Sequence, residues 1–134
     1  MEHHQFAEIA QEPAIQLILI AESDHGVGQF LTGALAEADR HYRISWVTSA
    51  IDALKVTKFL TPSLFILDYA LPDVNAVTLF DLLHMRKDLA QVPAIVLSTR
   101  LDGCEQELGR RNIIGLNLPL DLDDFLDTVE KALK

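Results

Sequence analysis

The stretch PSLFILDYALPD, residues 62–73, decides the fold of this chain. Its first half is a run of apolar residues that stops abruptly at a carboxylate, Asp68, and its second half is a turn built around Pro72. A short, nearly continuous apolar run is typical of a strand that is covered on both faces of a sheet. Aspartate is also a common turn residue, but the apolar run has little other reason to end in an acid. We therefore favour a functional role for Asp68.

The same alternation of apolar runs and helical stripes extends to both sides of this stretch. The apolar runs predict strands at residues 16–21, 43–49, 63–68, 94–98 and 113–118. The helical spacing of apolar residues predicts helices at 27–38, 50–60, 76–83, 102–111 and 122–133. Five such units predict an α/β fold with a doubly wound, five-stranded parallel sheet, and the flavodoxin-like strand order 2-1-3-4-5 is the common solution at this size.

Capping residues support several of the helix boundaries. Asn75 is suited to cap the helix that follows it, and Asp102 with Glu105 has the spacing of a capping box. Aspartates 121, 123 and 124 lie where the dipole of the last helix favours negative charge. The apolar face predicted for the first helix consists of Val27, Phe30, Leu31, Ala34, Leu35 and Ala38.

One domain accounts for most of the 134 residues, 49% of which are hydrophobic. Residues 1–13 are polar, end in a proline and carry almost no core pattern. We therefore expect a flexible N-terminal extension at 1–13 and a single domain at 14–134.

The composition argues against several classes of function. The net charge of −9 repels phosphate backbones, so we expect no nucleic-acid partner. No apolar run approaches the roughly 20 residues that span a bilayer, and the N-terminus lacks a signal-peptide pattern, so we expect a cytoplasmic protein without membrane contact. Cys104 is the only cysteine, which excludes an internal disulfide and indicates a packed thiol.

Two smaller features have structural explanations. Gly26-Val27-Gly28 begins like a dinucleotide-binding loop, but Leu31 stands where the third glycine should be, so helix-start glycines explain it better. Trp46, on a short predicted strand, indicates packing in the core or at an edge of the sheet.

The predicted strand order places a crevice between the carboxyl ends of strands 1 and 3. Glu22, Ser23 and Asp24 follow the first strand, Asp68 ends the third, and Ser98 ends the fourth. Carboxylates that face one crevice repel each other and favour a hard cation such as Mg²⁺. A carboxylate beside that cation can attack a phosphoryl group.

These landmarks resemble the response-regulator receiver domain, which is also called CheY-like. Residues 62–73 resemble the stretch that leads through the acceptor aspartate of that family into its Leu-Pro-Asp turn. Residues 17–22 (LILIAE) resemble its first strand and the first member of its acidic pair. Ser98 matches the hydroxyl residue that closes the fourth strand, and Pro119 matches the proline after the fifth. The resemblance covers about residues 15–134.

The resemblance implies a set of roles for individual residues. Asp68 would be the phosphoacceptor, with the Ser98 hydroxyl beside it. Glu22, Asp68 and the backbone carbonyl of Ala70 would hold Mg²⁺, and Asp24 is a candidate for a further ligand. A histidine kinase or a downstream signalling protein would be the partner. The face formed by residues 102–111, 113–118 and 122–133 would bind that partner or a second copy of the chain.

Several positions depart from the family pattern. Ser23 stands where the second, metal-binding acid belongs, which removes a full negative charge from the cation site. Leu118 replaces the lysine that pairs with the acceptor and its phosphoryl oxygens, so developing charge loses a fixed counterion. No aromatic residue precedes Leu118 in the fifth strand, and Asn75-Ala76 replaces Asp-Gly. Arg100 is a candidate for a compensating cation, although we favour its interpretation as an exposed loop arginine.

We therefore expect an atypical receiver in two-component-type signalling, a non-enzymatic module that acts mainly through protein–protein contact. Phosphorylation would be weak or lost, and Mg²⁺ binding weakened. The alternative is a phosphorylatable receiver in which Asp68 accepts a phosphoryl group from a histidine kinase with Mg²⁺. A flavodoxin-like redox protein is disfavoured, because the loop after the first strand lacks the hydroxyl-rich sequence that a flavin phosphate needs.

Overall fold

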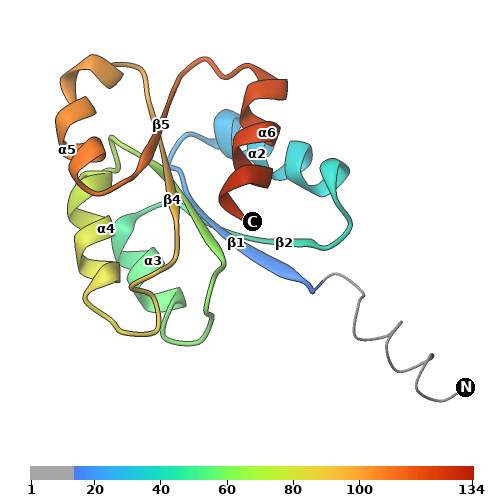
Figure 1. Ribbon diagram of the computed structural model, residues 1–134, viewed down its shortest axis with the longest axis horizontal. Coiled ribbons are helices and arrows are strands. Elements are labelled where there is room, and N and C mark those ends of the chain that lie inside the picture. The colour runs from blue at the N-terminus through green and yellow to red at the C-terminus, as the bar shows by residue number, and fades with distance from the viewer. Residues whose placement is uncertain (1–13) are drawn as a thin grey trace, which may run out of the picture.

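The computed structural model describes residues 14–134, and the predicted extension at 1–13 lies outside the described residues. A parallel sheet separates two layers of helices (Figure 1). The strands are β1 (Gln16–Ala21), β2 (Tyr42–Val47), β3 (Leu64–Asp68), β4 (Ala94–Ser98) and β5 (Ile114–Asn117). The helical elements are α2 (His25–Ala38), α3 (Ala50–Val56), α4 (Ala76–His84), the 3₁₀ turn η1 (Leu101–Gly103), α5 (Glu105–Arg110) and α6 (Leu122–Ala132).

The strand order is β2-β1-β3-β4-β5 and all four pairings are parallel, which confirms the predicted doubly wound sheet. Helices α2 and α6 cover one face, whereas α3, α4 and α5 lie on the other (Figure 1). Strand β3 occupies the centre, between β1 and β4. Among residues 14–134, no helix is long and apolar enough to cross a membrane.

Alternation along the strands divides the core between the two faces. Ile20 and Ile66 pack with Phe125 on the side of α2 and α6. Ala21 and Leu67, which follow them, pack on the side of α3, α4 and α5. The same alternation directs the next residues, Glu22 and Asp68, toward the α2–α6 side.

The predicted cap at Asn75 is confirmed, and Asp121, predicted only as a favourable charge at its helix start, is a cap as well. The Asn75 side chain accepts a hydrogen bond of 2.9 Å from the Thr78 N–H at the start of α4. The Asp121 carboxylate does the same for the Asp124 N–H at the start of α6, also at 2.9 Å. Both contacts satisfy backbone donors that the first helical turn leaves unpaired.

The predicted capping box at Asp102 and Glu105 is wrong. Residues 101–103 form a 3₁₀ turn, and α5 begins at Glu105 after Cys104, which makes no side-chain cap. Tertiary packing explains the difference, because Cys104 is buried and Leu101 packs over Gly115 of β5. A side chain added at Gly115 would approach Leu101 to 2.7 Å, so the absence of a side chain there makes room for this loop.

Two helices also differ from their predicted form. Helix α3 ends at Val56 rather than residue 60, and the Thr57 hydroxyl donates to the carbonyl of Ala53 at 3.0 Å. In α2, Leu31 and Leu35 are buried as predicted, but Phe30 is 43% exposed. The exposure of Phe30 has a direct bearing on the site described below.

Trp46 packs as an edge residue of the sheet, against the first turns of α2. Its indole N–H donates to the backbone carbonyl of Glu22 at 2.9 Å. A side chain at Gly28 would overlap the indole ring, so this glycine permits close packing between α2 and Trp46.

Candidate functional site

The Glu22 carboxyl lies at the carboxyl edge of the sheet, immediately after β1, and is only 2% exposed. Its Oε2 accepts a hydrogen bond of 3.1 Å from the Asp24 N–H. Its Oε1 is buried and has no hydrogen-bond partner among the described residues. Buried carboxyl oxygens are rarely left unpaired, so this atom is a candidate acceptor for a bound group.

The Glu22 carboxyl also lies beside Asp68, the last residue of β3. Burial raises the pKa of Glu22 to about 7, and the neighbouring Asp68 carboxyl together with the charge of Asp24 acts in the same direction. The Asp24 N–H opposes these effects. The structure therefore brings together the two acids that the strand order predicted.

The Asp68 side chain is half-buried and accepts a hydrogen bond of 3.2 Å from the Ala70 N–H. The role of the Ala70 carbonyl as a metal ligand stays a prediction. Asp24 lines the same crevice but caps α2, where its Oδ1 accepts from the Val27 N–H at 2.9 Å. Ser23 is exposed.

Ser98 ends β4 and is 7% exposed. Its Oγ accepts a hydrogen bond of 3.0 Å from the Arg100 N–H. Burial raises the pKa of the neighbouring Cys104 thiol, and a hydrogen bond with Ser98 partly opposes that shift. Cys104 is thus a packed thiol, as predicted, and the Ser98 hydroxyl is engaged with the loop that follows β4.

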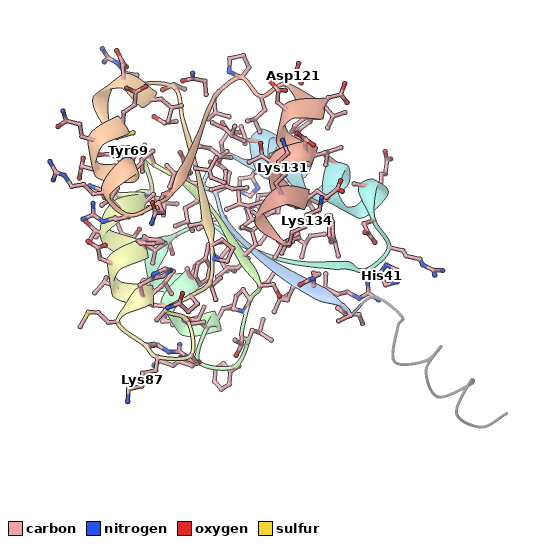
Figure 2. All side chains as sticks on the ribbon, in the orientation of Figure 1. His41, Tyr69, Lys87, Asp121, Lys131 and Lys134 are labelled. Carbon is pink, nitrogen blue, oxygen red and sulfur yellow. The ribbon has the colours of Figure 1, made fainter. Side chains whose placement is uncertain are left out.

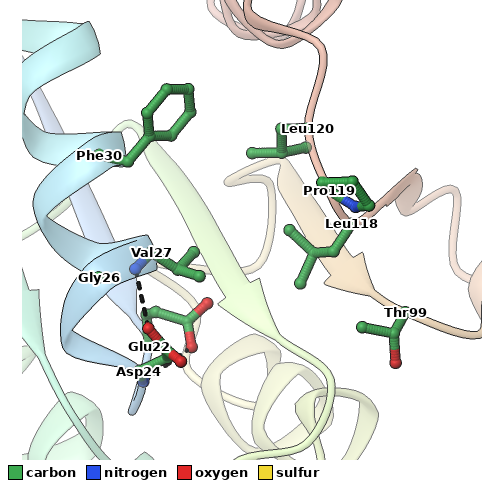
Figure 3. Close-up of a pocket in the computed structure, with 9 residues that line it drawn as sticks. All are labelled: Glu22, Asp24, Gly26, Val27, Phe30, Thr99, Leu118, Pro119 and Leu120. Carbon is green, nitrogen blue, oxygen red and sulfur yellow. Dashed lines mark hydrogen bonds between the residues drawn. The ribbon is translucent and has the colours of Figure 1, made fainter.

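A cavity of about 520 Å³ opens beside these acids. Figure 3 shows Val27 and Phe30 of α2 on one side and the apolar segment after β5 on the other. Leu118 belongs to that segment and packs against the core of the α2–α6 face. The lining residues are Glu22, Asp24, Gly26, Val27, Phe30, Thr99, Leu118, Pro119 and Leu120. None of them is basic, so the position that resembles the family lysine is part of an apolar wall.

Among residues 14–134, no lysine lines this cavity. Figure 2 shows Lys87 at the end of the molecule opposite Asp121. Lys131 and Lys134 pair with acids of their own helix, Asp127 at 3.0 Å and Glu130 at 4.0 Å.

The side chain of Arg100 is exposed and forms no hydrogen bond or ion pair with residues 14–134. Its interpretation as an ordinary loop arginine therefore fits the structure.

The acids form a reduced donor set for a metal. Within residues 14–134, no three histidine, cysteine or acidic side chains converge as a metal site. Glu22 and Asp68 remain as two carboxylates, with one unpaired buried oxygen between them. Such a pair fits Mg²⁺ only when water and backbone oxygens complete its octahedral shell.

The sequence predicted only a turn residue at Asp73, but its side chain connects the turn after β3 to α3. Its carboxylate accepts hydrogen bonds from the N–H groups of Ala50 at 3.0 Å and Ile51 at 2.8 Å, at the start of α3. These hydrogen bonds hold the pKa of Asp73 below its usual value. The contact spans more than 20 residues of sequence, so no local pattern could reveal it.

Comparison with known proteins identifies the fold. No protein-family model and no curated protein matches the chain. Among solved structures, the chemotaxis response regulator CheY4 of Vibrio cholerae matches with a TM-score of 0.81 and 18% identity, over 90% of this chain and 100% of its own. The non-phosphorylated HemR receiver domain of Leptospira biflexa matches with a TM-score of 0.78 and 23% identity, over 89% and 94%.

A third match is the receiver domain of a sensor histidine kinase from Pseudomonas aeruginosa, which holds a magnesium ion in its active-site cleft. Its TM-score is 0.74 and its identity 20%, over 90% of this chain and 98% of that domain. Together with the strand order, these matches show that the chain has the fold of response-regulator receiver domains.

Proposed function

We propose that this chain is an atypical, cytoplasmic receiver module of two-component signal transduction that acts through protein–protein contact, with phosphorylation of Asp68 weak or lost. The observation that carries this proposal is the environment of Leu118. Its side chain stands in an apolar wall facing Glu22, at the position where the family resemblance implies a lysine.

Electrostatics supports this conclusion. Transfer of a phosphoryl group adds negative charge to a crevice that already holds Glu22 and Asp68. Catalysis of such a transfer depends on fixed positive groups that stabilise the developing charge. The described residues place no lysine at the crevice, and Ser23 offers no charge to a metal ion.

The proposed partner is a histidine kinase or a downstream signalling protein. The candidate contact face consists of α5, β5 and α6, with β5 at an edge of the sheet. Ile114 of β5 is 39% exposed, and three aspartates crowd the start of α6, where Figure 2 labels Asp121. An apolar centre with acidic neighbours suits a partner with a basic rim. The same face would serve a homodimer.

The alternative function, a phosphorylatable receiver, is favoured by one observation. Glu22 and Asp68 lie together as an acidic pair, and the unpaired Oε1 of Glu22 is available to a cation or to a water molecule of its shell. In this alternative, Mg²⁺ would supply the positive charge that Leu118 does not.

Acetyl phosphate with Mg²⁺ separates the two functions. Transfer of its phosphoryl group to a carboxylate oxygen of Asp68 releases acetate and leaves an adduct that intact-mass spectrometry detects. We expect little adduct on the unmodified chain and clear accumulation on the double variant Ser23→Asp, Leu118→Lys, which restores the acid and the lysine.

Asp68→Asn is the matched control, because it removes the nucleophile and keeps the side-chain volume. Stoichiometric phosphorylation of the unmodified chain that Asp68→Asn abolishes would overturn the proposal in favour of the alternative.

A further inference from the structure

The cavity beside Glu22 has a composition that phosphoryl transfer does not require. Apart from Glu22, Asp24 and Thr99, its lining is apolar. Its volume of about 520 Å³ lies in the range of small-molecule sites, which are mostly apolar pockets with a few polar groups. Phe30 stands on its wall with 43% of its surface exposed, although it belongs to the apolar stripe of α2.

The base of the cavity presents an acceptor without a donor. Glu22 is 98% removed from solvent, its Oε2 is bonded to the Asp24 N–H, and its Oε1 has no partner among the described residues. An unpaired buried carboxyl oxygen costs free energy, so a donor that reaches Oε1 from the cavity would be bound favourably.

The charge of the cavity defines that donor. Glu22 and Asp24 line it, Asp68 lies beside Glu22, and no lysine, arginine or histidine of residues 14–134 lines it. An anion would be repelled, and a neutral group would gain less than a cation, because hydrogen bonds between charged partners are about twice as strong as neutral ones. The complementary ligand is therefore positively charged at one end and apolar at the other.

We propose that this cavity binds a small organic cation, namely a protonated amine on an apolar or aromatic body. Its ammonium group donates to Oε1 of Glu22, and its body packs between Phe30 and Leu118. The bound ammonium thus supplies a positive charge near Leu118, at the position where the family resemblance implies a lysine. This inference goes beyond the proposed function, because binding needs neither Mg²⁺ nor phosphorylation of Asp68.

Trp46 provides a built-in reporter for this site. It is the only tryptophan of the chain, and its indole N–H donates to the backbone carbonyl of Glu22 at 2.9 Å. A ligand that contacts the Glu22 side chain should shift the single indole N–H resonance. The amide signals of Val27, Thr99 and Leu120 report on the walls of the cavity.

The test is a titration of ¹⁵N-labelled chain with three probes of equal length: phenethylammonium, phenethyl alcohol and phenylacetate. The buffer contains a chelator and no phosphate donor. We expect phenethylammonium to bind at least about tenfold more tightly than the alcohol, since its positive charge adds an attraction to the carboxylates that the alcohol does not make. The carboxylate probe should not bind. The shifts should map to the lining residues and to the Trp46 indole.

Three variants test which residues are responsible for binding of the ammonium probe. Glu22→Gln keeps the volume of the side chain and should remove the preference for the ammonium probe. Leu118→Lys places an ammonium of the chain itself in the cavity and should abolish binding. Phe59→Ala, at an 87% exposed position outside the cavity, is the matched control and should bind as the unmodified chain does. The amide spectrum of each variant shows whether it is folded.

Three results would overturn the inference: equal affinity for the ammonium and the alcohol, shifts that map away from the lining residues, or unchanged selectivity in a folded Glu22→Gln variant. Each of them leaves the acetyl phosphate experiment unaffected, so the inference and the proposed function can fail separately.

Discussion

The two sides of the crevice differ in how closely their residues match the receiver pattern. The β1–β3 side keeps its acids, with Glu22 beside Asp68 and with Asp73 joined to α3. On the β5–α6 side, Leu118 stands in an apolar wall, and Leu101 fills the space beside Gly115. The central strands are buried on both faces, so apolar packing holds the sheet together. The comparison teaches that the buried strands specify the fold, whereas the residues around the crevice carry its chemistry.

The largest expected effect compares packing on the two sides. Leu67→Ala, in the fully buried end of β3, should lower the free energy of unfolding by about 3 kcal/mol, because it leaves a cavity in the core. Leu118→Ala should cost about 1 kcal/mol or less, because the side chain is half-exposed and lines an existing cavity. Urea unfolding of both variants measures the contrast. Equal losses would mean that the β5–α6 side supports the fold as strongly as β3 does.

The second effect depends on pH and belongs to the acidic side. The pKa of Glu22 is about 7 in the folded chain against an ordinary value of 4.5, so the folded state binds more protons between these values. The contribution of Glu22 to stability should therefore fall as the pH rises through this window, by an amount on the order of 2 kcal/mol. Glu22→Gln has no titratable carboxyl at this position, so it should lose less stability over the same pH range.

Urea unfolding in chelator-containing buffer, repeated across this pH range, measures the difference between the two proteins. Parallel stability curves for the unmodified chain and Glu22→Gln would show that burial does not raise the pKa of this carboxyl.

The third effect compares two glycines. Gly28→Ala would drive a methyl group into the Trp46 ring, which overpacking data place at a cost of about 1–3 kcal/mol. Gly115→Ala meets only the flexible ends of Leu101 and Leu108, so its cost should stay under about 1 kcal/mol. Gly33→Ala, which has open space in the same helix as Gly28, should stabilise the chain by about 0.5–1 kcal/mol. Thermal denaturation ranks the stabilities of the three variants. A Gly115→Ala variant less stable than the Gly28→Ala variant would contradict the comparison.

The smallest effect should be equal on the two sides. Asn75→Ala and Asp121→Ala each remove a side-chain cap and should each lower the free energy of unfolding by about 1 kcal/mol. Asp121→Asn keeps an accepting oxygen and should be nearly neutral. A large loss in this control would indicate that the charge of Asp121, rather than its hydrogen bond, stabilises α6.

The sheet could be predicted because its central strands consist of apolar runs, and right-handed crossovers leave few ways to order them. The proximity of Glu22 and Asp68 followed from that order. The start of α5 could not be predicted, because the packing of Leu101 and Cys104 overrides the local spacing of Asp102 and Glu105.

The cavity escaped prediction for a similar reason. Helical spacing predicts that Phe30 faces the core, and only the three-dimensional arrangement shows that its outer part borders an opening. The family resemblance did imply a lysine at the position of Leu118. That its side chain would complete an apolar wall opposite a buried carboxyl depends on the path of the segment after β5.

The hydrogen bonds of Asp73 also bear on how the chain opens locally. Because one carboxylate holds the N–H groups of both Ala50 and Ile51, the turn after β3 and the first turn of α3 should loosen together as one cooperative unit. In hydrogen exchange, these two amides should lose protection together in Asp73→Ala, while the amides of β5 keep theirs. A disturbance at Asp68 would thus reach α3 through the backbone of residues 69–73, on the side of the molecule away from β5.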